Sequence, residues 1–116
     1  MVVSAAEAAA SVDDASADPH LWYDPGAVPE LAEEVRQQLG RLSPDAAPYF
    51  DAQHTAWTAE LGPYLQSVSA LRARCAGRHY AATDPVFDRM AAALGLTDAT
   101  PAGYRRSVRD LSLIHI

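Results

Sequence analysis

The feature that most constrains the fold is a long apolar pattern in the middle of the chain. Its members recur at spacings of three, four and seven residues, the repeat of one helix face: Phe50, Trp57, Leu61, Tyr64, Leu65, Val68, Leu71 and Cys75. Gly77 is a natural stop, so the pattern predicts a helix over Pro44–Ala76, roughly 50 Å long at about 1.5 Å per residue. Pro63 removes one backbone donor and predicts a kink over 59–63. Because this helix would exceed the width of a small domain, we expect it to cross between two lobes or to flank a large one.

A second helical pattern precedes the long one. It spans Pro29–Leu42, and its apolar residues mark one buried face: Leu31, Ala32, Val35, Leu39 and Leu42. Ser43 is then expected to act as the N-cap of the long helix, with Pro44 as its first residue.

The segment that follows the long helix has the pattern of half an α/β unit. His79–Ala82 is a strand candidate. Asp84 is placed to cap a helix that opens at Pro85 and that Gly95 ends. The order of strand, turn and helix predicts an α/β class, although most of the chain is helix-rich.

The C-terminal end carries three further predictions. Residues 100–104 are expected to form a turn, and Arg105–Arg109 an exposed basic stub. Residues 111–116 break with the Ala/Arg-rich style before them and resemble a translated sequencing-adapter end. We therefore expect an artefactual tail there, and His115 receives no functional weight.

Composition narrows the classes of function. The net charge is −6 over 116 residues and no basic patch occurs, which argues against a nucleic-acid partner. An acidic chain suits cation capture. Cys75 stands alone, which excludes an internal disulfide and a thiolate cluster and predicts a small buried side chain. No stretch is long and apolar enough to span a membrane, and Met1–Ala10 lacks the basic and apolar regions of a signal peptide.

The strongest candidate for chemistry is Asp18-Pro19-His20-Leu21-Trp22-Tyr23-Asp24-Pro25. Each proline fixes its own φ and favours an extended conformation in the aspartate before it. His20 is therefore expected on a short, stiff, non-helical segment. Such a segment suits a metal ligand, because it keeps the lone pair of the imidazole nitrogen pointing in one direction. The alternative interpretation is a plain turn with a partly exposed histidine.

This stretch resembles the D-P-H-x-W-x-D-P signature of the zinc/manganese solute-binding proteins of ABC transporters, in which the histidine binds the metal. A second segment, Ala82–Phe87, resembles the T-E-P-V-F type segment of the same family, in which an acidic residue or histidine binds the metal. Here Asp84 replaces the commoner glutamate. The resemblance implies that His20 and Asp84 are metal ligands. Aspartate is one methylene shorter, so the metal would have to lie closer to the helix end. The alternative for Asp84 is a simple N-cap.

The resemblance also implies a two-lobed α/β protein with the metal in the cleft between the lobes. Residues 1–43 would end the N-terminal lobe, 44–76 would form the long interlobe helix, and 77–110 would begin the C-terminal lobe. The implied protein is an extracytoplasmic binding component, periplasmic or a cell-surface lipoprotein, that captures zinc or manganese and delivers it to a permease. A monomer without enzymatic activity is expected. Further ligands, a histidine upstream and an acidic residue downstream, would lie outside this chain.

The remaining histidines give weaker signals. His54 has no acidic or histidine partner at i+4, and we predict a solvated residue on the polar face of the long helix. His79 on the predicted strand is interpreted in the same way.

Two other classes of function stay open from the residues alone. A zinc-dependent hydrolase could use His20 and Asp84 to hold a metal that activates water. However, the H-E-x-x-H, G-x-S-x-G and P-loop motifs are missing. The third class is a helical interaction fragment without a ligand.

Overall fold

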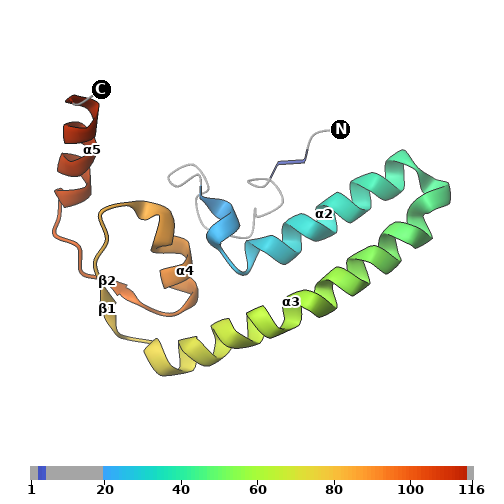
Figure 1. The fold of residues 1–116 in the computed structure, drawn as a ribbon, viewed down its shortest axis with the longest axis horizontal. Coiled ribbons are helices and arrows are strands. Elements are labelled where there is room, and N and C mark those ends of the chain that lie inside the picture. Colours follow the sequence, from blue (N-terminus) through green and yellow to red (C-terminus); the bar gives the residue numbers. More distant parts are fainter. Residues whose placement is uncertain (1–2, 5–19, 115–116) are drawn as a thin grey trace.

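The fold is taken from a computed structural model that describes residues 3–4 and 20–114 (Figure 1). The helices are η1 (Leu21–Tyr23), α2 (Ala27–Leu42), η2 (Pro44–Ala46), α3 (Ala47–Cys75), η3 (Pro85–Phe87), α4 (Asp88–Ala93) and α5 (Tyr104–Ile114). The strands are β1 (His79–Tyr80) and β2 (Thr97–Asp98). The radius of gyration is 17.8 Å, against about 13 Å for a compact domain of this length. The described chain is therefore elongated.

The predicted long helix is confirmed. The 3₁₀ turn η2 begins at Pro44 and leads into α3, which is helical throughout and passes through Pro63 without interruption. Figure 1 shows α3 as one continuous, gently curved ribbon. Gly77, with φ of 81°, follows the end of the helix as expected. The side chain of Ser43 makes no capping hydrogen bond, so that part of the prediction is wrong.

The apolar face of α3 is not buried as its spacing predicted. None of its 29 residues, all in the described part of the chain, is buried, and Tyr64 and Leu71 remain 41% and 44% exposed. Cys75 is half-buried rather than fully buried. The helix that packs along α3 is α2, which lies beside the first part of it (Figure 1). Periodicity identified the apolar face, but burial also requires an element that covers it.

The predicted α/β unit is present and more complete than expected. β1 and β2 are parallel, with His79 opposite Thr97 and Tyr80 opposite Asp98, and η3 and α4 form the crossover between them. The strand is shorter than predicted, and β2 was not predicted at all. Gly95 turns the chain from α4 into β2 with φ of 70°, and a Cβ there would lie 3.2 Å from the Cβ of Ala76. Only glycine fits this close turn without strain.

The predicted exposed stub at 105–109 is confirmed for Arg106 and Arg109, which are exposed, and wrong for Arg105. These residues belong to α5, and the side chain of Arg105 is only 23% exposed because it forms ion pairs with the α/β unit. The helix continues to Ile114, so residues 111–114 of the expected tail form its last turn. None of the described helices combines the length and apolarity needed to cross a bilayer.

The buried apolar side chains come from the early part of the described chain and from the α/β unit. Among the described residues they are Leu21, Pro25, Ala27, Ala91 and Leu94. Leu21 belongs to η1 and Ala27 begins α2, whereas Ala91 and Leu94 lie on and just after α4. Contacts of η1 with both α2 and α4 connect the early turn with the α/β unit.

Candidate metal-binding site

His20 lies at the start of a short, locally hydrogen-bonded turn. Its backbone is non-helical, with φ of −83° and ψ of 48°, and its carbonyl accepts a bond from the Tyr23 N–H at 3.2 Å. Asp24 Oδ1 accepts from the Gly26 N–H at 2.8 Å and closes the end of the turn. Leu21 is buried and anchors the segment. The predicted non-helical setting of His20 is therefore confirmed, whereas Asp18 and Pro19 lie outside the described residues.

Two aromatic rings pack around the imidazole. The ring centroid of Trp22 lies 5.7 Å from that of His20 in an edge-on arrangement, and that of Tyr23 lies 6.3 Å away. Both aromatic residues remain exposed to solvent, at 58% and 43%. These contacts restrict the orientations that the imidazole can adopt.

Asp84 immediately precedes η3, and its own backbone is extended, with φ of −129° and ψ of 146°. Its Oδ1 accepts a hydrogen bond from the Val86 N–H at 3.0 Å, so the predicted capping role is confirmed. Pro85 is the first residue of the turn, also as predicted. The side chain is exposed, and a carboxylate that caps through one oxygen retains lone pairs for a cation.

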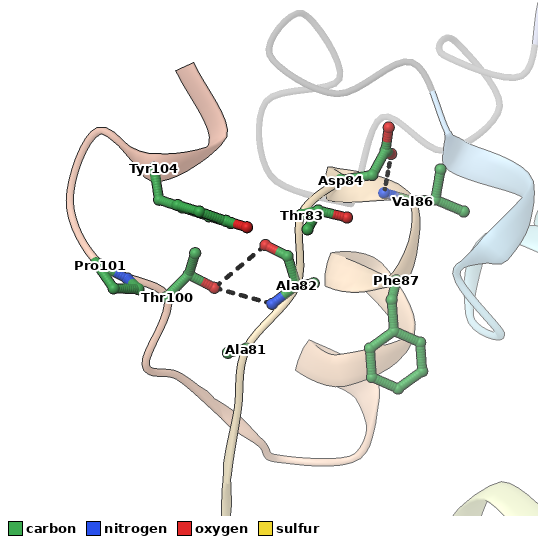
Figure 2. A pocket seen from close by; sticks show the side chains of 9 residues that line it. All are labelled: Ala81, Ala82, Thr83, Asp84, Val86, Phe87, Thr100, Pro101 and Tyr104. Carbon is green, nitrogen blue, oxygen red and sulfur yellow. Dashed lines mark hydrogen bonds between the residues drawn. The ribbon is translucent and has the colours of Figure 1, made fainter. Parts of the chain in front are cut away.

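A pocket of about 710 Å³ opens next to this turn (Figure 2). It is lined by Ala81, Ala82, Thr83, Asp84, Val86, Phe87, Thr100, Pro101 and Tyr104. Asp84 is the one charged residue among them. The hydroxyl of Thr100 contacts both peptide groups of Ala82, accepting from its N–H at 3.1 Å (Figure 2). The segment of the pocket lining that leads to Asp84 is thus hydrogen-bonded to Thr100, in the loop after β2.

The turns of His20 and Asp84 lie near one another, but their side chains do not share this pocket. The contact between η1 and α4 holds the two segments together, and Figure 2 shows the pale blue ribbon of η1 beside Val86. His20 does not line the pocket. Among the described residues, no group of three or more histidine, cysteine, aspartate or glutamate side chains is placed to hold a metal ion. What the described chain offers is a pair of candidate ligands on adjacent elements.

The other two histidines lie elsewhere. His79 is exposed on β1. His54 is not the solvated residue that was predicted, because its side chain is only 25% exposed and its Nε2 lies 3.7 Å from Glu33 Oε2. It lines an apolar groove of about 420 Å³ between α2 and α3. A search for partners four residues away in the sequence could not find this contact, because Glu33 lies on α2 and His54 lies on α3.

Acid is expected to weaken the ion pair between Glu33 and Arg36, which lies within α2. The Arg36 guanidinium holds the pKa of Glu33 at about 2, against an ordinary value of 4.5, and also bonds Asp51 at 2.6 Å. Because the pKa is lower in the folded state, the stabilisation is full above pH 4.5 and is lost as the pH falls towards 2. Glu33 is 39% exposed, so we expect an effect of about 1 kcal/mol or less. Urea denaturation of wild type and Glu33→Gln should differ near pH 6 and converge as the pH falls below about 4; a difference that stays constant with pH would contradict this.

The comparison with known proteins identifies the family of the chain. A family model described as the periplasmic zinc-uptake complex component A, ZnuA, matches residues 2–112. The chain belongs to this family. The resemblance drawn from the segments of His20 and Asp84 is therefore confirmed at the level of the family. The search of curated proteins and the search of solved structures each found no match.

Membership of the ZnuA family gives the chain a coarse function, that of a periplasmic metal-binding component of zinc uptake. Sequence reasoning missed two residues that support the second turn, Thr100 and Arg105. Thr100 had been placed in a plain turn, and Arg105 in a solvated stub. A run of arginines after a glycine gives no local sign that one of them points inward.

Proposed function

We propose that this chain forms part of the extracytoplasmic solute-binding component of an ABC transporter, and that its cargo is zinc or manganese. The match to a periplasmic zinc-uptake family supports the proposal. The observation that carries it is the packing of η1 against α4, which brings the turn of His20 beside the unit that Asp84 opens. An imidazole nitrogen and a carboxylate oxygen are donors that both zinc and manganese accept.

In this proposal the chain contributes to both lobes of the binding protein. Residues 1–43 end the first lobe, 44–76 form the long connecting helix, and 77–110 begin the second lobe. His20 then comes from one lobe and Asp84 from the other, with the metal in the cleft between them. Zinc usually takes four ligands, so the proposed site needs two donors besides His20 and Asp84. Limited closure of the lobes around the ion would present the loaded protein to the permease.

Zinc titration of two proteins, the complete gene product and the 116-residue chain, tests this proposal. We expect the complete gene product to bind one zinc ion tightly in competition with a chromophoric chelator. The 116-residue chain alone should bind more weakly than about 1 µM, because two protein ligands leave the remaining coordination to water. Failure of the complete product to bind either zinc or manganese would overturn the proposal. Nanomolar binding by the chain alone would show that other residues, such as His54 or His79, complete the site.

A further inference from the structure

The guanidinium of Arg105 joins three separate segments of the α/β unit. Its Nε donates to the carbonyl of Ala82 at 3.0 Å, and its two terminal nitrogens form a fork on the carboxylate of Asp88, one of them at 2.9 Å. One terminal nitrogen also lies 3.3 Å from Asp98 Oδ2. Arg105 therefore connects α5 with the segment before Asp84, with the first residue of α4 and with the end of β2.

The same segment is held from a second side by Thr100. The Thr100 hydroxyl accepts from the Ala82 N–H at 3.1 Å, and the Thr100 N–H donates to Asp98 Oδ1 at 2.8 Å. Both peptide groups of Ala82 thus have partners outside their own segment. Ala82 lies two residues before Asp84, so these contacts fix the backbone from which the Asp84 side chain departs.

The charges around this cluster favour a fixed arrangement. Asp88 raises the pKa of Arg105, mainly through their hydrogen bonds, and a guanidinium is in any case always charged. Asp88 also accepts from the Tyr80 hydroxyl at 2.8 Å, so its carboxylate is held by two side chains. The hydrogen bonds of Thr100, and then the charge of Arg105, lower the pKa of Asp98. A planar fork bound on several sides has little freedom to move.

We propose that Arg105 is a positioning residue for metal binding, which acts by fixing the Ala82–Asp84 backbone and thereby the direction of the Asp84 carboxylate. The inference rests on the proposed role of Asp84 as a ligand. Residues that orient a metal ligand without touching the ion commonly contribute about ten- to a hundredfold to affinity. Lysine keeps the positive charge but cannot reproduce a fork that also donates to a carbonyl.

The test compares Arg105→Lys with Arg106→Lys in the complete gene product. Arg106 is the exposed neighbour on the same helix and serves as the matched control. We expect Arg105→Lys to lower zinc affinity about tenfold and to change the visible absorption spectrum of the bound cobalt(II) ion. Arg106→Lys should leave both unchanged. Thr100→Val removes the hydroxyl that contacts Ala82 and Asp98 but leaves the fork of Arg105 on Asp88 in place. It should shift the zinc affinity in the same direction, so the inference can still be tested if Arg105→Lys fails to fold.

A double-mutant cycle separates positioning from general stability. If Arg105 acts through Asp84, then Arg105→Lys should cost no further affinity in an Asp84→Ala background. Equal losses in both backgrounds would overturn the proposal, because the effect would then not pass through Asp84. Loss of affinity in Asp84→Ala but not in Arg105→Lys or Thr100→Val would refute the inference and leave the proposed function intact. Unchanged affinity in Asp84→Ala itself would instead remove Asp84 from the site.

Discussion

Replacing Asp84 or His20 by alanine is expected to weaken zinc binding by the complete gene product at least tenfold, which is about 1.4 kcal/mol. Each substitution removes one donor from a small coordination shell, and water replaces it poorly. The two positions are 64 apart in sequence (84 − 20), but η1 and α4 hold their segments together. Competition titration with a chromophoric chelator measures the loss directly.

Asp84→Asn separates the two roles of this side chain. The amide oxygen can still accept from the Val86 N–H, so the cap should survive, whereas the negative charge for the cation is lost. We expect Asp84→Asn to lose affinity as Asp84→Ala does, while only the alanine variant loses about 1 kcal/mol of stability. If Asp84→Ala lowers the stability but leaves the zinc affinity intact, the residue is a cap and no ligand.

His54→Ala supplies the matched control for the loss of an imidazole. His54 lies in the groove between α2 and α3, near Glu33, and the proposed site does not use it. Its substitution should leave zinc affinity unchanged. A loss equal to that of His20→Ala would place the metal between α2 and α3 and would contradict the proposed site.

The parts of the fold that could be predicted depend on local signals. The long helix follows from an apolar repeat that continues across Pro63, and its end follows from Gly77. The cap by Asp84 follows from the same kind of short-range rule, because a carboxylate before a proline at a helix start has one nearby donor to accept from. In both cases the partners lie within a few residues.

The parts that could not be predicted depend on distant partners. β2 has two residues, too few for a recognisable alternation, and it exists because its backbone pairs with β1. The partial burial of Arg105 depends on its hydrogen bonds to Asp88, which lies 17 residues earlier. The exposure of the apolar face of α3 could not be read from its spacing, because a pattern shows which side is apolar and not what covers it.

The small set of buried apolar side chains makes its own strong prediction. Leu94→Ala should lower the free energy of unfolding by about 2–4 kcal/mol, since Leu94 is one of the few buried apolar side chains in the described part of the chain. Leu42→Ala is the matched control, because Leu42 is 63% exposed at the far end of α2 and should cost well under 1 kcal/mol. Urea denaturation followed by circular dichroism gives both values.

The same pair of variants connects the packing of α4 with metal binding. Leu94 directly follows α4, and α4 both follows the turn of Asp84 and contacts η1, which carries the turn of His20. Loosening the end of α4 should therefore weaken zinc binding in Leu94→Ala and not in Leu42→Ala. Equal stability losses in the two variants would show that burial of Leu94 does not stabilise the fold. A destabilised Leu94→Ala that still binds zinc with full affinity would show that metal ligation, rather than the packing at the end of α4, sets the distance between the two turns.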